Sequence, residues 1–165
     1  MSRARDFVFN AIGSALGLGL SPIAPGSFGA LLGVVYALPV FLYLDVAWRP
    51  FTIALGLVAV SAANHFLTPW AVAYWKDEDP GHFVLDEIAG YLMVPLLLPQ
   101  GTLWQIGFWG FLLFRVFDII KIPPARQIDR NMHGSWGILL DDLVSGAYAA
   151  LVLYAYRWLA PAIGW

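Results

Sequence analysis

The stretch that decides the fold class is FTIALGLVAVSAANHFLTPWAVAYW, residues 51–75, which contains no Asp, Glu, Lys or Arg. A helix needs about 20 mainly apolar residues to cross the hydrocarbon core of a bilayer. On either side, the stretches Phe7 to Leu44 and Ile88 to Phe114 also lack charged residues, and a shorter one runs from Leu143 to Tyr156. The pattern predicts an all-α, polytopic membrane helical bundle.

The composition of the 165 residues supports this prediction and excludes other classes. Apolar residues make up 60% of the chain and charged residues 12%, whereas roughly 25% of an average soluble domain is charged. The formal net charge of -2 lacks the basic excess of a nucleic-acid surface. The absence of cysteine excludes disulfides, thiolate metal sites and a cysteine nucleophile. We therefore expect contact with membrane lipids and no nucleic-acid partner.

The loop Ser21-Pro22-Ile23-Ala24-Pro25-Gly26-Ser27 divides the first charge-free stretch, because two prolines and a glycine do not fit a continuous helix. Before this loop, Phe7 to Leu20 is expected to form an interfacial or re-entrant helix. After it, Ser27 is expected to cap a first membrane span that runs from Phe28 to about Leu44.

The amino-terminal segment also has an alternative interpretation as a signal peptide, because Arg3 and Arg5 precede an apolar run. However, Asn10 interrupts that run, and no convincing small-x-small cleavage site follows it. We therefore expect this segment to remain in the mature chain.

The turn Pro99-Gln100-Gly101-Thr102 cuts the stretch that begins at Ile88 into two antiparallel spans. Their apolar parts, residues 88–98 and 103–114, cover little over half of the hydrocarbon thickness at about 1.5 Å per residue. Charged flanks must complete both spans, and they bring in Asp86, Glu87, Arg115, Asp118 and Lys121. With a last span from Asp141 to about Ala160, we expect about five spans in one membrane-embedded domain, residues 1–165.

The basic residues predict which end of the bundle faces the cytoplasm. Alternating five spans puts the amino terminus and the 76–87 and 121–140 loops on one side, with Arg3, Arg5, Lys76, Lys121, Arg126 and Arg130. The opposite side holds Arg49, and Arg157 lies near the end of the last span. Since cytoplasmic loops carry an excess of Lys and Arg, the first side is expected to be cytoplasmic.

Five carboxylates are predicted to meet at this cytoplasmic boundary. Asp86 and Glu87 open the third span, Asp118 lies one turn from the end of the fourth, and Asp141 and Asp142 open the fifth. Burying so much negative charge without compensation is costly. A hard divalent cation compensates it, because Mg²⁺ takes oxygen ligands and keeps several waters. We therefore predict that all five residues are metal ligands and catalytic residues.

These acids also have structural alternatives. The four that open helices are favoured by the positive end of a helix dipole, whatever their function. Asp118 is at a helix carboxyl end, where a negative charge is unfavourable. Its alternative is an intrahelical pair with Arg115 or Lys121, each three residues away.

Cations in the same region are candidates for binding phosphate. Arg115 and Lys121 lie nearest the acids and are the better candidates, whereas Arg126 and Arg130 equally fit a role in orienting the protein. His133 would donate to a phosphate or protonate a leaving oxygen near neutral pH, and it equally fits a solvated loop position.

The glycine-rich amino-terminal section supplies two further candidates. The hydroxyls of Ser21 and Ser27 would face the same boundary as the carboxylates and bind phosphate. Close helix packing also explains the section, since Gly13/Gly17 and Gly29/Gly33 have GxxxG spacing. A homo-oligomer is compatible with that spacing.

Three segments together resemble the phosphatidylglycerophosphatase A family of bacterial membrane lipid phosphatases. The first is GLGLSPIAPGS at 17–27 and the second is DEIAG at 86–90. The third, the most specific, combines FRVFDIIK at 114–121, DRNMHG at 129–134 and GILLDD at 137–142. The family commonly has Lys-Pro-x-Pro where this chain has Lys121-Ile122-Pro123-Pro124.

The resemblance implies a helical, Mg²⁺-dependent enzyme in the bacterial cytoplasmic (inner) membrane. Such an enzyme removes the terminal phosphate of phosphatidylglycerophosphate at the cytoplasmic face and yields phosphatidylglycerol. The acidic motif positions of the family fall on Asp86, Glu87, Asp118, Asp141 and Asp142, and the basic ones on Arg115, Lys121 and Arg130.

Three rival functions are weighed against this one. An ion-coupled transporter would place acids near the midplane between internal repeats, and no repeat is detectable. A CDP-alcohol-type phosphotransferase would need regularly spaced aspartates on two consecutive helices, which the chain does not show. A non-catalytic assembly subunit is supported only by the GxxxG spacings.

Overall fold

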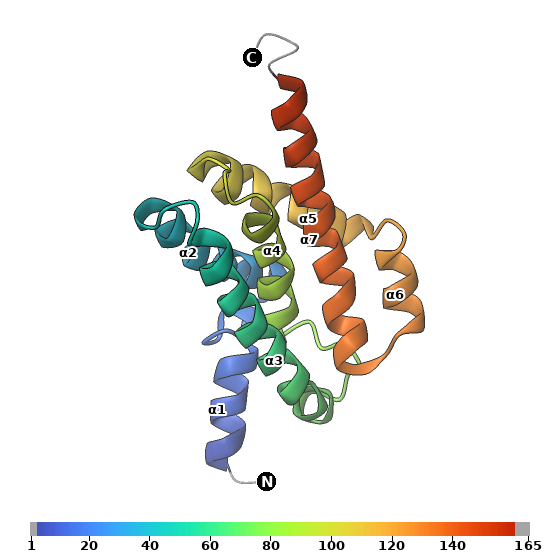
Figure 1. Cartoon of the computed structure of the whole chain (residues 1–165). Helices are drawn as coiled ribbons and strands as arrows, with labels where there is room; N and C mark the ends of the chain where they lie inside the picture. Colours follow the sequence, from blue (N-terminus) through green and yellow to red (C-terminus); the bar gives the residue numbers. More distant parts are fainter. Residues whose placement is uncertain (1–2, 161–165) are drawn as a thin grey trace.

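The computed structural model describes residues 3–160, and every regular element within them is a helix (Figure 1). The predicted all-α fold is thereby confirmed. The ends of the expected domain, residues 1–2 and 161–165, lie outside the described residues. The elements are α1 (Arg3–Gly13), η1 (Leu18–Leu20), α2 (Pro25–Tyr43), α3 (Arg49–Trp75), α4 (Leu85–Leu97), η2 (Gln105–Gly110), α5 (Phe111–Ile120), α6 (Ala125–Asn131) and α7 (Gly134–Leu159).

Three of the described helices, α2, α3 and α7, are long and apolar enough to cross a membrane. The expected count of about five spans is not confirmed. Helix α4 has 13 residues. The π-helix η2 has 6 residues and the helix α5 that continues it has 10. Both are shorter than the roughly 20 residues of a spanning helix.

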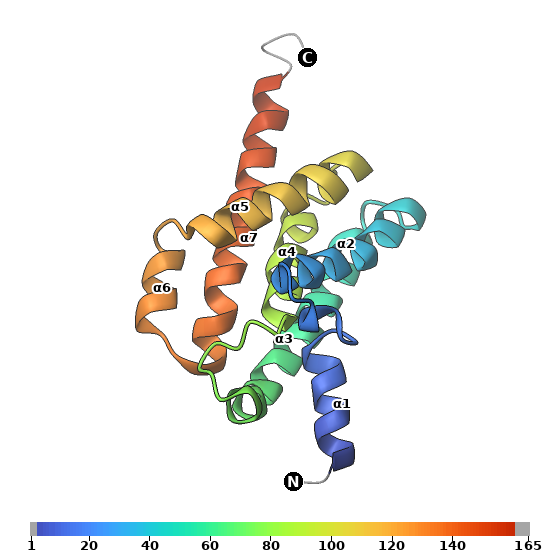
Figure 2. The same ribbon diagram turned by 180° about the vertical axis from the view of Figure 1, so that it is seen from behind.

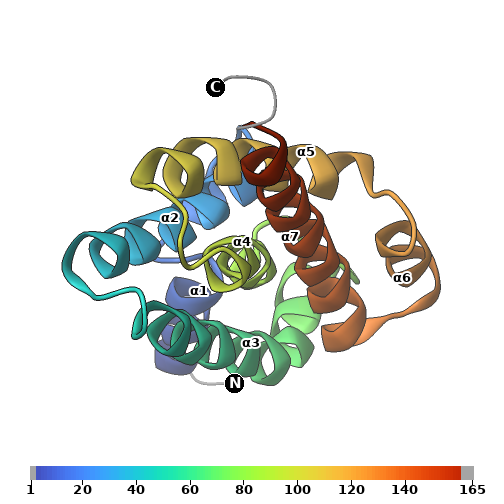
Figure 3. The ribbon, with the colours of Figure 1, turned by 45° about the horizontal axis from the view of Figure 1, so that its top comes forward.

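Helix α4 is the centre of the bundle, with α2, α3, α5 and α7 around it (Figure 3). It approaches α7 backbone to backbone, because a Cβ at Gly146 would lie 1.9 Å from the carbonyl oxygen of Gly90. Buried Tyr91 donates a 3.0 Å hydrogen bond from its hydroxyl to the carbonyl of Ile106. A short helix enclosed in this way has its amino-terminal carboxylates inside the protein.

The amino-terminal ends of α1 and α7 and the carboxyl end of α3 lie at one end of the molecule, and the carboxyl end of α7 lies at the other (Figures 1 and 2). Figure 2 also shows α5 crossing α7 steeply. The GxxxG pair Gly29 and Gly33 packs α2 against Val84 and Tyr91, while Gly17 has nothing within 4 Å. The pair Gly29 and Gly33 therefore serves contacts within the chain.

Two predicted helix starts are wrong. Helix α7 begins at Gly134, not Asp141, so Asp141 and Asp142 lie two turns inside it and away from the favourable end of its dipole. Helix α2 begins at Pro25, with Ala24 as its N-cap, so Ser27 does not cap it. A proline with its fixed φ is well suited to the first helical position, which explains the earlier start.

Two other predicted segments also differ from the structure: one predicted helix is broken, and one predicted loop contains a helix. The segment from Phe7 to Leu20 is not one helix, because α1 runs from Arg3 to Gly13 and only η1 follows. Ala15 and Leu16 have positive φ values there, which breaks the helix. The 121–140 loop contains the short helix α6, which carries Asp129.

Candidate active site

Three carboxylates form the most concentrated acidic group among the described residues. Asp86 and Glu87 in the first turn of α4 and Asp142 in α7 present oxygens that all lie within 4.8 Å of one another. Asp86 is 7% exposed and Asp142 is 4% exposed. One buried oxygen of each, Asp86 Oδ1, Glu87 Oε2 and Asp142 Oδ2, has no hydrogen-bond partner among the described residues.

Such oxygens identify the kind of ligand that fits this group. A buried acceptor without a donor costs about 1–3 kcal/mol, and more when it is charged. An all-oxygen donor set suits a hard divalent cation such as Mg²⁺. The group is therefore fitted to hold a divalent cation, which would compensate the charges that the protein leaves uncompensated.

The close contact of α4 and α7 assembles this three-acid group. A Cβ at Gly90 would lie 2.8 Å from the Cβ and the carbonyl oxygen of Asp142. The absence of a side chain at Gly90 therefore lets Asp142 reach the first turn of α4. Sequence spacing alone gives no distance between α4 and α7, so it could not show which of the five acids lie together.

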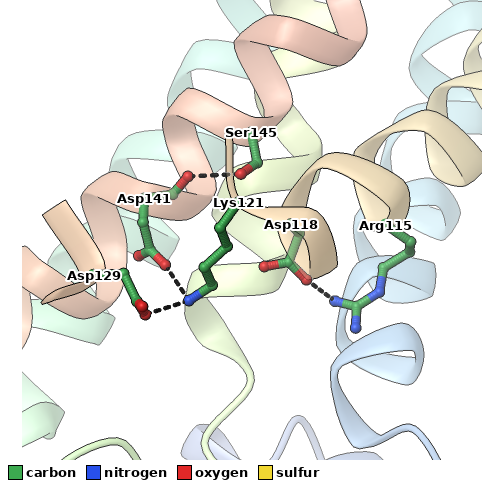
Figure 4. Close-up of polar contacts among 6 residues, drawn as sticks. All are labelled: Arg115, Asp118, Lys121, Asp129, Asp141 and Ser145. Atoms are coloured by element: carbon green, nitrogen blue, oxygen red, sulfur yellow. Dashed lines mark hydrogen bonds and ion pairs between the residues drawn. The ribbon is translucent and has the colours of Figure 1, made fainter. Parts of the chain in front are cut away.

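Asp118 lies beside the three-acid group, in the last turn of α5. Its Oδ2 is 2.6 Å from Nη1 of Arg115, so the intrahelical pair considered from the sequence is present (Figure 4). Asp118 is 9% exposed and its charge acts on both Glu87 and Asp142. The Arg115 Nε is buried and has no hydrogen-bond partner among the described residues.

Asp141 faces a different partner, Lys121, at the carboxyl end of α5. The Lys121 Nζ donates to Asp141 Oδ2 at 2.6 Å and also to Asp129 Oδ1 (Figure 4). Removal from water lowers the pKa of Lys121, but the two carboxylates outweigh it and raise that pKa. The ammonium therefore stays charged. Ser145 Oγ donates to the backbone carbonyl of Asp141 at 2.9 Å.

The start of α2 reaches the same region. A Cβ at Gly26 would lie 2.2 Å from Glu87 Oε1 and 2.9 Å from Arg115 Nη1. Ser27 follows Gly26 and is half-buried, whereas Ser21 uses its hydroxyl in its own turn by donating to the carbonyl of Ile23 at 2.9 Å. The predicted meeting of this loop with the acids thus occurs at Gly26.

The remaining predicted residues lie farther out. Arg130 is exposed on α6, and His133 is exposed as the N-cap of α7. His133 lines a small cavity together with Asp141 and Asp129. Their roles in binding phosphate stay predictions.

Sequence reasoning missed Asp129 and Asp79. The sequence predicts a loop around Asp129. The one sign of its contact with Lys121 is that it lies eight residues further along, in a charged segment. Asp79 lies in the loop after α3. Partial removal from water raises its pKa, Lys121 lowers it and Asp129 raises it, so the net pKa is above the usual range.

The fold and the site together define a class: an all-helical protein with helices of membrane length and a buried acidic group fitted to a divalent cation. Residues 11–157 match the model of the family described as phosphatidylglycerophosphatase A. The chain therefore belongs to the phosphatidylglycerophosphatase A family, a family of phosphatases, as the resemblance predicts.

Named relatives cover most of the chain. Phosphatidylglycerophosphatase A of Escherichia coli K12 is 33% identical over 141 residues, 84% of this chain and 77% of the relative. The Haemophilus influenzae enzyme of the same name is 32% identical over 142 residues, 86% and 84% of the two chains. A Bacteroides thetaiotaomicron protein with the provisional name phosphatidylinositol-3-phosphatase is 32% identical over 152 residues, 90% and 92%. No solved structure matches the chain.

Proposed function

We propose that this protein is a Mg²⁺-dependent lipid phosphomonoesterase that hydrolyses phosphatidylglycerophosphate to phosphatidylglycerol and phosphate. One observation carries the proposal: Asp86, Glu87 and Asp142 present carboxylate oxygens within 4.8 Å of one another, and each of these residues has a buried oxygen without a hydrogen-bond partner among the described residues. In a chain of this phosphatase family, a cation-binding group beside Arg115, with Lys121 bound to the neighbouring Asp141, supports phosphate chemistry.

The three-acid group would hold the metal, and Asp118 would support it from α5. A bound Mg²⁺ supplies positive charge to the phosphoryl oxygens and makes a bound water more acidic. Asp118 holds the Arg115 guanidinium at 2.6 Å, which leaves the buried Arg115 Nε free of protein partners among the described residues. Arg115 would therefore offer a donor to an equatorial phosphate oxygen.

Lys121 would neutralise a second phosphate oxygen. Its ammonium is already charged and lies between two carboxylates, so a phosphate would compete with Asp129 or Asp141 for its donors. Because Asp129 is more exposed than Asp141, its contact is the easier one to exchange. Asp129 thus tunes the availability of Lys121, and Arg130, His133, Ser21 and Ser27 would complete the phosphate surroundings.

The apolar helices suit a substrate that stays in the bilayer. Helices α2, α3 and α7 would span it, and α4 and the η2–α5 segment would complete five spans when their charged flanks are included. The single domain would then present its acidic site at the cytoplasmic face of the bacterial inner membrane. The acyl chains would remain among the apolar helices while the headgroup enters the site.

The decisive experiment measures phosphate release by the purified full chain in detergent, with and without a chelator. We expect release from phosphatidylglycerophosphate that stops with the chelator and returns when Mg²⁺ is added. Asp118→Asn should release little phosphate while still inserting into membranes. Metal-independent release, or faster release from phosphatidylinositol 3-phosphate assayed in parallel, would contradict the proposed metal or the proposed headgroup respectively.

A further inference from the structure

We infer that the protein holds a second divalent cation, in an acidic cavity separate from the three-acid group. This acidic cavity has a volume of about 120 Å³ and lies between the loop after α3, the end of α6 and the first turns of α7. Its wall includes Glu78, Asp79, Asp129, His133 and Asp141. Four of these five residues carry a carboxylate.

The charge around the cavity is strongly unbalanced. Four carboxylates contribute -4 and the ammonium of Lys121, bound to two of them, contributes +1, which leaves -3. Glu78, Asp79 and Asp129 are exposed, so water screens part of the repulsion among these like charges, and a cation would relieve the rest. A divalent ion would bring the cavity close to neutrality.

A second observation points to a ligand, and it concerns Asp141. This residue is 4% exposed and forms part of the cavity wall. Lys121 binds its Oδ2 at 2.6 Å, whereas its Oδ1 is buried and has no hydrogen-bond partner among the described residues. Figure 4 shows this second oxygen turned away from the Lys121 ammonium. A cation in the cavity would supply the missing partner.

The geometry of α7 explains why there are two sites and not one. Successive residues on an α-helix point about 100° apart. Asp142 accordingly meets Asp86 and Glu87 on α4, while its neighbour Asp141 faces Lys121 and Asp129 on the side of α6. The adjacent acids therefore serve two different groups of ligands.

The size of the cavity favours a hydrated ion. A water occupies about 30 Å³ in the liquid, so the cavity has room for a few waters around an ion. Mg²⁺ binds through one or two carboxylates and keeps several of its waters. Asp79 and Asp129 would hold such an ion partly through these waters, and the ion would tie the loop after α3 to α6 and α7.

The test counts bound ions on the purified full chain in detergent, by calorimetry with Mg²⁺ and by electron paramagnetic resonance with Mn²⁺. We expect two ions per wild-type chain. Asp79→Asn should weaken one of them by at least about tenfold and leave the other unchanged. Asp142→Asn should weaken the other one. The matched control is Asp77→Asn, in the same loop but outside the cavity wall. The asparagine keeps an oxygen that accepts from the backbone amide of Asp79. This variant should still bind two ions.

This inference fails independently of the proposed function. One ion per wild-type chain, with Asp79→Asn binding it as the wild type does, would overturn the second site. Chelator-sensitive phosphate release in that same preparation would leave the proposed function standing. Two ions on a chain whose phosphate release ignores chelators would support the second site and contradict the proposed function.

Discussion

The charged groups at the two ends of the bundle differ in how far their hydrogen bonds are satisfied. At the end away from the acids, the Arg49 guanidinium donates to the carbonyls of Leu44, Pro99 and Phe41 at 3.0–3.1 Å, and lies 4.6 Å from the centre of the Phe41 ring. At the other end, Asp86, Glu87 and Asp142 approach one another and keep unpartnered buried oxygens.

This difference separates structural charge from functional charge. The donors of Arg49 are satisfied by carbonyls at the ends of α2 and α4, so its charge joins these elements to α3 and needs no ligand. Each of the three acids has a buried oxygen without a partner among the described residues, whereas buried acceptors normally have partners, and this contrast is why we propose a cation there. A helical chain with apolar helices of membrane length can thus carry buried charge for either purpose, and the state of the hydrogen bonds distinguishes the two.

The largest effect is expected from a substitution in the three-acid group. Asp142→Asn removes one charged oxygen of the three-acid group, so phosphate release should fall by at least about 1,000-fold, because even groups outside the metal ligands cost about 10–100-fold. The same change removes an uncompensated buried charge, so the metal-free protein should unfold at a higher temperature. Initial rates with saturating Mg²⁺ and thermal unfolding in detergent measure the two effects.

Asp45→Asn, in the exposed turn before α3, is the matched control and should change neither quantity. Equal rates for Asp142→Asn and the wild type would show that Asp142 does not contribute to the metal site.

The second largest effect is expected from a substitution of Arg49, whose donors are satisfied. Arg49→Ala leaves three carbonyls without their donor and should lower the free energy of unfolding by about 3 kcal/mol. Turnover by the protein that remains folded should be unchanged, because Arg49 lies at the end away from the acids. Thermal unfolding and kcat measured on the same preparation test both statements.

Arg49→Lys is the control that keeps the charge but not the fork of donors, and it should lose an intermediate amount of stability. A loss of kcat without a loss of stability would contradict the assignment of Arg49 as structural.

The same contrast explains what the sequence could predict. Charge-free stretches predicted the all-α fold and the positions of α2 and α3, because long apolar runs depend only on local composition. The start of α7 at Gly134 was missed, since the two glycines in GSWGILL, residues 134–140, disfavour a helix when this segment is considered alone. Helix α4 lies where a span was predicted, but it is shorter than a membrane-spanning helix and is enclosed by other helices, a property that only packing decides.

The candidate site was predicted as a set of residues but not as an arrangement. All five carboxylates do lie in one region, yet Asp142 joins Asp86 and Glu87, Asp118 pairs with Arg115, and Asp141 pairs with Lys121. The rotation of α7 and the close approach at Gly90 decide this division. Neither can be obtained from spacing along the chain.

A smaller effect sharpens the difference between cations inside and outside the site. Lys121→Ala should raise KM and lower kcat/KM by roughly 10- to 100-fold, because a hydrogen bond to a charged group contributes about 1.5–3 kcal/mol. Arg126→Ala, on the exposed side of α6, should change kcat/KM less than about twofold. Kinetics over a range of phosphatidylglycerophosphate concentrations measure both, and equal losses would mean that the two residues act only through general charge.

The smallest effect concerns the contact between α2 and the site. Gly26→Ala would place a methyl carbon 2.2 Å from Glu87 Oε1 and 2.9 Å from Arg115 Nη1, so both side chains must move. Overpacking of this kind costs about 1–3 kcal/mol. Since Glu87 is a flexible side chain, we expect a loss of stability near the lower limit, together with a smaller kcat/KM and a weaker affinity for Mg²⁺ because Glu87 is displaced.

Gly81→Ala is the matched control, because a Cβ at Gly81 would meet nothing within 4 Å. It should leave both kcat/KM and the Mg²⁺ affinity unchanged. If Gly26→Ala lowered thermal stability but left the Mg²⁺ affinity intact, α2 would only support the fold at this point. A joint change in Mg²⁺ affinity and KM would instead show that the close approach of α2 positions Glu87 and Arg115 for their ligands.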